Sequence, residues 1–420
     1  MNRELLKNLC LKDQTGIYGI PASAEDFDTN KVRYLRITDI SPDGNLLDND
    51  KKSVSSENIE KYILNDGDIV FARTGNSTGK TYYHESKNGI LAYAGFLIKY
   101  SLDPKKVNPK YLKYFTISNE YRTWVNNLSL GSTRGNINAQ TFSNCPILLP
   151  SRNQQDLLVS ILSSLDDKIE LNNRINSELE NLAKTIYDYW FVQFDFPDEN
   201  GKPYKSSGGK MVYNQELKRA IPAGWEVGTL SKLGDIAGGS TPSTKNPLNF
   251  CHNGTAWITP KDLSLNVGNK FISRGELDVT DAGIKEASLK IYPKGTILLS
   301  SRAPIGYMAV ARNEVTTNQG FKSFIPNKRF SIPFVYYTVK NSMNAIIKQA
   351  SGSTFKEVSL TTLKDNVYIC LPSNTVVDFY TKKVNSIFKQ QDILEQENQQ
   401  LTQLRDWLLP MLMNGQITVK

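Results

Sequence analysis

An internal duplication is the sequence feature that most constrains how this 420-residue chain folds. Three matches carry it: residues 128–134 resemble 349–355, residues 147–150 resemble 369–372, and residues 67–73 resemble 295–302. The second copies begin 221, 222 and 228 residues after the first. A fourth match pairs Ile37–Ser41 with the run through Asp262–Ser264. The chain is therefore predicted to contain two related halves, each large enough for a domain.

Each half ends in a long polar helix pattern whose apolar residues recur at spacings of three and four, the seam of a coiled coil. The predicted seam positions are Leu158, Leu162, Leu165, Ile169, Asn176, Leu179, Leu182 and Ile186 in the first helix, and Tyr380, Val384, Ile387, Leu394, Asn398, Leu401, Leu404 and Leu408 in the second. Six of the apolar pairs share an offset of 222 residues, and so do Asn176 and Asn398. A polar seam residue fixes the register at a cost in stability.

The predicted fold class is α+β, with two mixed α/β domains separated by two long antiparallel coiled-coil helices in a pseudo-two-fold internal repeat. The predicted segments are residues 1–150 (first domain), 151–191 (first helix), 192–220 (linker), 221–372 (second domain) and 373–420 (second helix and tail). Proline and glycine break both periodicities in the linker. Pro410 is expected to end or kink the second helix. Neither helix has a partner within its own half, so the two are expected to bury their seams against each other.

The composition is that of a cytoplasmic protein compatible with a polyanionic partner. The chain has 50 lysine and arginine residues against 42 aspartate and glutamate residues, a net charge of +8. No stretch approaches the roughly 18 apolar residues of a membrane span, and the first ten residues lack the apolar region of a signal peptide. The four cysteines and two histidines are scattered, so neither a metal site nor a cofactor is expected in this chain.

Two related but different domains on a helical spacer suggest a protein that reads two short DNA segments at a fixed separation. At about 1.5 Å per residue, a helix of the predicted length spans roughly 60 Å. One turn of DNA is about 34–36 Å long, so such a spacer can hold two domains about one turn apart. Because the domains differ in sequence, they should read different bases.

Several strings around the linker and in the tail resemble one known family, the specificity subunits of type I restriction–modification systems. They are Leu182–Phe191 (LAKTIYDYWF), Phe194–Pro197 (FDFP), Gly201–Gly209 (GKPYKSSGG), Ile221–Trp225 (IPAGW), Leu404–Pro410 (LRDWLLP) and Asn414–Gly415. The resemblance covers nearly the whole chain. It is specific in the helices and the linker and loose in the two domains, as variable readers would be.

The resemblance implies a non-catalytic, DNA-binding subunit. Its two target-recognition domains would each read one half of a bipartite site in double-stranded DNA, and its helices would space them and dock two methyltransferase subunits. Those subunits would hold S-adenosylmethionine and methylate adenine, and translocating restriction subunits would join to cleave unmethylated DNA. The second domain starts with Trp225–Val227 and Gly238–Pro242, as the family often does. The first domain lacks that opening, and this departure from the family pattern leaves its N-terminal fold open.

Two motifs point toward an enzyme, and both are incomplete. Gly75–Thr81 (GNSTGKT) resembles a P-loop, but Thr74 stands where the first glycine should be and the following run reads as a strand. Lys80 in this loop would instead contact a DNA phosphate, or the loop is a plain surface turn. Asp103–Lys105 and Asn108–Tyr111 lack the second proline of an adenine methyltransferase loop. No catalytic constellation is therefore expected.

The candidate DNA-binding residues are Arg73, Lys80, Thr133, Arg134, Arg302, Asn318, Gln319, Ser353 and Lys356. Arg73 and Arg302 end matching strands, where arginine either binds guanine or phosphate or forms a surface salt bridge. The hydroxyl groups of the matching Gly-Ser-Thr turns would donate to phosphates or cap helices. Asn318 and Gln319 are candidates for reading adenine.

The aromatic residues Trp190, Phe191 and Trp407 lie near the predicted helix ends, where they either pack on the domains or anchor a methyltransferase subunit. Two other functions stay open: an enzyme that uses a nucleotide or S-adenosylmethionine, and a structural coiled-coil adaptor. The incomplete motifs argue against the enzyme, and two large, basic, related domains argue against the adaptor. Binding of S-adenosylmethionine and salt-dependent binding of DNA would separate the three.

Overall fold

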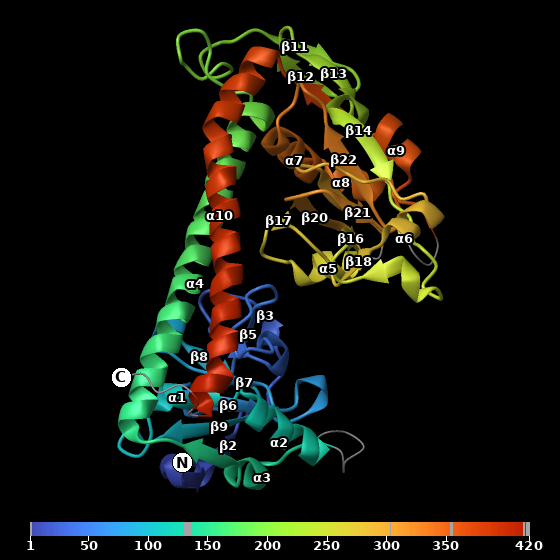
Figure 1. Ribbon diagram of the computed structural model, residues 1–420. Coiled ribbons are helices and arrows are strands. Elements are labelled where there is room, and N and C mark those ends of the chain that lie inside the picture. Colours follow the sequence, from blue (N-terminus) through green and yellow to red (C-terminus); the bar gives the residue numbers. More distant parts are fainter. Residues whose placement is uncertain (1, 130–135, 303, 353–355, 415, 417–420) are drawn as a thin grey trace. The chain divides into compact units, whose positions relative to one another are not determined.

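We describe a computed structural model that covers residues 2–129, 136–302, 304–352, 356–414 and 416. Its contacts divide the chain into two units, residues 1–169 with 400–420 and residues 170–399. Each unit contains one globular domain and one part of each long helix (Figure 1). Both units combine sheets with helices, so the predicted α+β class is confirmed. None of the helices within these ranges has the length and apolarity needed to cross a membrane.

Unit 1 contains two four-stranded sheets and a separate strand pair. The first sheet has the order β2 (Cys10–Tyr18), β9 (Leu97–Leu102), β6 (Asp68–Ala72), β7 (Thr81–Tyr83). The second has the order β3 (Glu25–Asp26), β5 (Lys52–Val54), β4 (Val32–Leu35), β8 (Leu91–Tyr93), and β1 (Asn2–Leu5) pairs with β10 (Pro146–Leu149). The helices are α1 (Pro109–Phe115), α2 (Asn119–Ser129) and α3 (Ala139–Ser143), with short 3-10 turns η1 (Leu6–Leu9), η2 (Ile37–Asp39), η3 (Ile59–Tyr62), η4 (Gly75–Ser77) and η5 (Ser86–Asn88).

Unit 2 contains the same sheets with one strand added. The first sheet has the order β14 (Gly234–Gly238), β22 (Lys322–Pro326), β19 (Ile297–Ser301), β20 (Ile305–Ala311), β17 (Phe271–Ile272). The second has the order β15 (Phe250–Cys251), β18 (Leu277–Val279), β16 (Thr255–Ile258), β21 (Val315–Thr317), and β13 (Glu226–Thr229) pairs with β23 (Tyr368–Leu371). The helices are α5 (Pro260–Leu265), α6 (Asp281–Glu286), α7 (Ile332–Asn341), α8 (Met343–Lys348) and α9 (Leu360–Asp365), with 3-10 turns η7 (Leu230–Leu233) and η8 (Pro247–Asn249).

The duplication extends to the strand register. Strand β4 runs parallel to β8 in unit 1, and β16 runs parallel to β21 in unit 2. The point where the two sheets of a domain meet is also repeated, because a Cβ at Gly19 or at Gly239 would lie 2.2 Å from a backbone oxygen of Ala94 or Asn318, respectively. Both positions therefore require glycine. The two domains are copies of one fold.

A buried aspartate explains the match between Ile37–Ser41 and the run through Asp262. In unit 1 the Asp39 carboxylate accepts the Arg36 backbone N–H at 2.8 Å, which closes the turn η2. In unit 2 the Asp262 carboxylate accepts the Thr259 backbone N–H at 2.8 Å at the start of α5. A side chain that reaches back to the preceding backbone N–H satisfies a donor that the helix leaves open. The sequence match is thus a repeated capping interaction.

The start of the first domain, whose fold the sequence analysis left open, matches the start of the second. Strand β1 pairs antiparallel with β10, and β13 pairs antiparallel with β23 in the other domain. A 3-10 turn follows in both cases, η1 after β1 and η7 after β13, and the first strand of the main sheet comes next. The repeat of this first strand could not be recognised in the sequence, because a short, partly exposed strand can be formed by many residue types.

The segment read as a linker, residues 192–220, is folded. The Asp195 carboxylate accepts the Ser206 backbone N–H and hydroxyl, both at 2.7 Å. The Phe196 ring stacks on Tyr204 and on Trp225, with centroids 4.7 and 5.0 Å apart. The hairpin of β11 (Met211–Asn214) and β12 (Arg219–Pro222) completes it. Its glycines and prolines therefore form turns of a small, ordered structure.

The first long helix is α4 (Arg152–Tyr187), which continues as a π-helical turn η6 (Asp188–Val192), and the second is α10 (Asn374–Met413). Helix α10 does not end at Pro410. Proline removes the N–H that would bond the carbonyl four residues earlier. The last turn is nevertheless held by Leu412 and Met413, which are buried in the core of unit 1.

The two helices pair in opposite directions. In unit 2 the Asn172 side chain donates to Asn398 at 2.9 Å, and the rings of Tyr187 and Tyr380 lie 6.2 Å apart. Later residues of α4 thus contact earlier residues of α10, as in an antiparallel pair. In unit 1 the Arg405 guanidinium lies 3.3 Å from the Asp166 carboxylate. The predicted antiparallel arrangement of the helices is thus found within each unit (Figure 1).

Most predicted seam residues are buried or half-buried: Leu158, Leu162, Leu165, Ile169, Asn176, Leu179, Ile186, Tyr380, Val384, Ile387, Leu394, Asn398, Leu401 and Leu408. Leu182 and Leu404 are 49% and 42% exposed, and their neighbours Ala183 and Arg405 are buried instead. A strict alternation of three and four also includes Asn172 and Gln391, and both are buried. The sequence reading preferred apolar residue types over the strict heptad register, and this preference displaced two positions.

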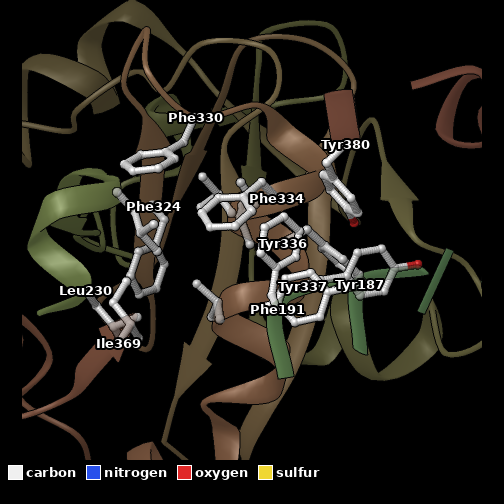
Figure 2. Packing of buried hydrophobic residues seen from close by; sticks show 14 of the residues in the cluster. Tyr187, Phe191, Leu230, Phe324, Phe330, Phe334, Tyr336, Tyr337, Ile369 and Tyr380 are labelled. Atoms are coloured by element: carbon white, nitrogen blue, oxygen red, sulfur yellow. The ribbon is translucent and has the colours of Figure 1, made fainter. Parts of the chain in front are cut away.

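An aromatic cluster joins the domain of unit 2 to the helices, and Figure 2 shows the rings of Tyr187, Phe191, Phe334 and Tyr380 gathered in it. Phe191 lies 4.9 Å from Phe334 and 5.0 Å from Tyr380, measured between ring centroids. These rings come from η6, α7 and α10, respectively. Trp190 is buried in the same cluster, so Trp190 and Phe191 pack on the domain, whereas Trp407 is exposed. Edge-to-face pairs add to the free energy gained from burial.

We predict that Phe334→Ala destabilises unit 2 by about 3–5 kcal/mol, because it opens a cavity among four aromatic rings. Urea unfolding of the full chain, followed by tryptophan fluorescence, measures the loss. The control is Phe379→Ala, whose exposed side chain on α10 should matter by less than about 0.5 kcal/mol. Equal losses for the two variants would contradict the role of the cluster.

A buried polar network joins the same domain to both helices. The Lys270 ammonium lies 2.6 Å from the Glu180 carboxylate and donates to the Gln391 amide oxygen at 2.6 Å. The Glu395 carboxylate accepts the backbone N–H groups of Lys270 and Phe271 at 2.7 and 3.0 Å. Lys270 is buried, and burial lowers its pKa to about 8 although Glu180 opposes the change. Such a pair is strongly destabilising when one partner is removed.

Glu180 predicts an acid-sensitive contribution to stability. Burial raises its pKa, but Lys270 and Lys340 outweigh burial and hold the pKa at about 2, below the ordinary 4.5. The stabilisation, on the order of 3 kcal/mol, is thus present above pH 4.5 and lost as pH falls toward 2. We expect the stability gap between wild type and Glu180→Gln, measured by urea unfolding, to shrink between pH 6 and pH 3. A gap that stays constant over this range would contradict the ion pair.

Candidate nucleic-acid interface

In unit 1 three chain segments meet at the end of strand β6. The Arg73 backbone N–H donates to the Phe96 carbonyl at 3.0 Å, and the Ile137 N–H donates to the Arg73 carbonyl at 2.9 Å. The Arg73 guanidinium lies over the Tyr18 ring, 5.0 Å from its centroid, and its Nε donates to the Asn136 side chain at 3.3 Å. The end of the first sheet thus presents an arginine beside two exposed aromatic residues.

Unit 2 repeats this junction with other side chains. The Ser301 N–H donates to the Gly320 carbonyl at 2.8 Å, and the Val358 N–H donates to the Ser301 carbonyl at 3.0 Å. Ser301, and not Arg302, is therefore the structural counterpart of Arg73. The string Gly295–Arg302 is one residue longer than Gly67–Arg73, so Arg302 lies one residue past the matching position.

Three predicted residues come together at this end of unit 2. Arg302 lies 3.9 Å from the Glu357 carboxylate, close enough for a half-exposed ion pair. The Asn318 side chain accepts the Gly320 backbone N–H at 2.9 Å, which occupies its oxygen. The exposed Gln319 accepts a hydrogen bond from the Thr241 hydroxyl. Lys322 also lies 3.3 Å from Glu357, so one carboxylate partly neutralises two cations.

In unit 1, Lys80 lies beside the end of strand β6, but its side chain is directed away from Arg73. Its backbone carbonyl accepts the Ala72 N–H at 2.8 Å, while its ammonium donates to the Ile40 carbonyl at 3.2 Å. The 3-10 turn η4 begins at the preceding Gly75, and strand β7 follows Lys80 directly. A P-loop places the N-terminus of a helix at this point. The described loop lacks that helix, which supports the reading of the motif as a turn.

The matching Gly-Ser-Thr turns lie largely outside the described residues, and so do Thr133, Arg134 and Ser353. Lys356, which follows the second turn, is exposed. The helices that follow the turns are capped by other residues. Asn138 accepts the Thr141 N–H at 2.8 Å at the start of α3, and Ser359 accepts the Thr362 N–H at 3.0 Å at the start of α9.

Among the cysteines and histidines, Cys10, Cys145 and His84 are buried, Cys251 and Cys370 are half-buried, and His252 is exposed. Burial raises the pKa of the Cys10 thiol to about 11 and lowers the pKa of the buried His84. The His84 ring lies 3.4 Å from the Tyr82 hydroxyl. In the part of the chain that the structure describes, no group of three or more histidine, cysteine and acidic side chains could hold a metal ion.

The model of the family described as the type I restriction modification DNA specificity domain matches residues 17–181 and again residues 222–403. The chain belongs to this family. Each match covers one domain and most of the helix that follows it, in agreement with the duplication. The family membership assigns the chain to the specificity subunits, which are not the catalytic subunits of these systems.

Two curated relatives carry the same description. The MjaIX specificity subunit of Methanocaldococcus jannaschii is 45% identical over 184 residues, which cover 42% of this chain and 42% of that protein. The HindI specificity subunit of Haemophilus influenzae is 27% identical over 410 residues, which cover 85% of this chain and 88% of that protein. The crystal structure of the type I specificity subunit from M. genitalium superposes with a TM-score of 0.56 at 15% identity, over 98% of this chain and 95% of that one, and so shares the fold.

The sequence reading missed Tyr18, Phe96 and Asn136. By sequence, Gly95-Phe96 of the first domain aligns with Gly320-Phe321 of the second. The strand registers instead make Gly320 the structural equivalent of Phe96. Phe321 is fully buried and Phe96 is 59% exposed. A shift of one residue at a strand end exchanges a core residue for a surface residue, so only the hydrogen-bond pattern could separate the two.

We predict that Glu357→Gln raises the affinity of this specificity subunit for DNA of any sequence, roughly threefold at low salt, because it frees the charges of Lys322 and Arg302. Filter binding of the chain with its partner subunits, at two salt concentrations, measures the change. Glu314→Gln, an exposed change elsewhere in the same domain, is the matched control. Weaker binding by Glu357→Gln alone would show that the carboxylate positions the arginine for recognition.

Proposed function

We propose that the chain reads a bipartite double-stranded DNA target, with each globular domain recognising one half. The observation that carries the proposal is the repeated strand-end junction, which has the same backbone hydrogen bonds in both domains and different side chains around them. A common scaffold with variable side chains is what two readers of different sequences require. The net charge of +8 favours association with the phosphate backbone.

The residues that are candidates for contacting DNA differ between the two domains. In the first domain Arg73 is the candidate for a guanine. Lys80 is the weaker candidate for a phosphate, because its ammonium already donates to the Ile40 carbonyl. In the second domain Gln319, held by Thr241, is the candidate for an adenine edge, and Lys356 for a phosphate. Asn318 is the weaker candidate, because its side-chain oxygen already accepts a backbone hydrogen bond.

We further propose that the helices space the domains and dock two methyltransferase subunits. Leu171 and Leu182 are exposed on α4, and Ile393 and Leu404 are exposed on α10. Leu171 and Leu182 are 11 positions apart, which places them on one face of α4 about three turns apart. The second pair repeats the first at an offset of 222 residues. Two copies of one apolar pair favour two copies of one partner.

The chemistry belongs to those partners in this account. The methyltransferase subunits hold S-adenosylmethionine and methylate adenine within the bound site, and restriction subunits join the complex in the cytoplasm to cleave unmethylated DNA. This chain supplies the recognition of the DNA sequence and the spacing between the half-sites.

Mapping of methylated adenine in cells that co-express the chain with its cognate methyltransferase subunit tests the proposal. The expected motif is two short half-sites around a fixed gap. Replacing residues 1–150 with the first domain of another specificity subunit should change one half and leave the other half and the gap. A continuous motif, or methylation that persists without this chain, would contradict the proposal and favour a structural adaptor.

The docking proposal predicts a change in stoichiometry. Leu182→Glu and Leu404→Glu should each reduce the bound methyltransferase subunits from two to one, because each places a charge in one of two equivalent apolar contacts. Native mass spectrometry of the purified complex counts the subunits. Leu265→Glu, on an exposed position outside the two long helices, should retain both. Two bound subunits in all three variants would place the docking site elsewhere.

A further inference from the structure

The first domain carries a cluster of side chains that the second domain replaces at every matching position. The Arg73 cluster consists of Tyr18, Arg73, Phe96 and Asn136, and the strand registers and junction hydrogen bonds match these residues to Gly238, Ser301, Gly320 and Glu357. An aromatic and cationic surface therefore stands where the second domain presents two glycines, a serine and a carboxylate. From this difference we expect the two domains to recognise different bases.

Phe96 is held out by a rigid turn. The Gly95 N–H donates to the Ile20 carbonyl at 2.9 Å and the Leu97 N–H donates to the Ala94 carbonyl at 2.8 Å, so the backbone on both sides of Phe96 is fixed. Its carbonyl accepts the Arg73 N–H. One exposed apolar side chain is ordinary on a protein surface. The pairing of β6 with β9 places this one opposite Arg73, whose guanidinium lies over the exposed Tyr18 ring, and the three residues form a surface suited to a base edge.

Arg73 is oriented before any ligand binds. Its guanidinium lies on the Tyr18 ring, and its Nε is used by Asn136. The two terminal nitrogens are the pair that a bidentate contact with guanine O6 and N7 employs. Holding a flexible side chain in its binding geometry reduces the entropy lost on association.

We propose that the Arg73 cluster reads a guanine and a neighbouring thymine in the first half of the target. Arg73 binds guanine O6 and N7, and Phe96 packs on the thymine methyl group. Tyr18 and Asn136 are positioning residues, which orient Arg73. The inference rests on the proposed function and deepens it, since it assigns base types to one domain.

The test uses the complex of the full chain with its methyltransferase subunit and the target found by methylation mapping. In competition binding, 7-deazaguanine, which lacks the N7 acceptor, replaces each guanine of the first half in turn, and uracil replaces each thymine. We expect wild type to lose roughly tenfold in affinity at one guanine, and Arg73→Ala to lose a similar factor on normal DNA but nothing further on that analogue. Phe96→Ala should likewise abolish the smaller loss caused by uracil at one thymine.

Phe27→Ala, another exposed aromatic residue of the same domain, is the control and should behave as wild type on every DNA. Arg73→Lys keeps the charge without the fork and should also lose discrimination at the guanine, which covers the case in which Arg73→Ala does not assemble. Analogue losses that persist in the variants, or a first half without a G·C pair, would overturn the inference alone. A wild-type complex without a bipartite motif would instead overturn the proposed function.

Discussion

The two long helices complete the hydrophobic cores of the globular domains, and the rest of the architecture depends on this packing. In unit 1 Leu158 and Leu162 of α4 lie in one core with Leu409 and Leu412 of α10. In unit 2 residues of both helices share a core with the sheet and α7, among them Tyr187 and Tyr380. Each domain therefore needs a piece of both helices, which explains why the contacts divide the chain within the helices and not at the domain ends.

Each domain is also fastened to the helices by charges, and here the two copies differ. In unit 1 Asp166 accepts hydrogen bonds from Lys113 and Tyr114 and lies near Arg405. In unit 2 the contact runs through Lys270, Glu180 and Glu395, next to the added strand β17. Apolar packing tolerates many orientations of similar energy, whereas buried hydrogen-bonded charges accept few. We infer that these networks fix the orientation of each domain on its helix pair.

The sequence predicted the duplication, the α+β class, the two long helices and most of the seam. Periodicity and repeated capping motifs depend on residues that are close together in the chain, so they can be recognised without the structure. The sequence analysis misplaced Leu182 and Leu404, because leucine is a more typical seam residue than the neighbouring Ala183 and Arg405, which are the buried ones. It also paired Arg73 with Arg302, because an arginine follows both strands, although the matching backbone hydrogen bonds belong to Arg73 and Ser301. Tyr18 and Phe96 were missed for a related reason, as the cluster forms only when distant strands end together.

The proposed function requires that two copies of one domain read two half-sites through the same strand-end junction. A chain in which residues 2–149 are replaced by a second copy of residues 226–371 tests it most directly, since these ranges begin and end at equivalent strands. Adenine-methylation mapping of cells that express this chain with its methyltransferase subunit should yield two inverted copies of the second half-site around a gap. An asymmetric motif that still contains the original first half would contradict the account.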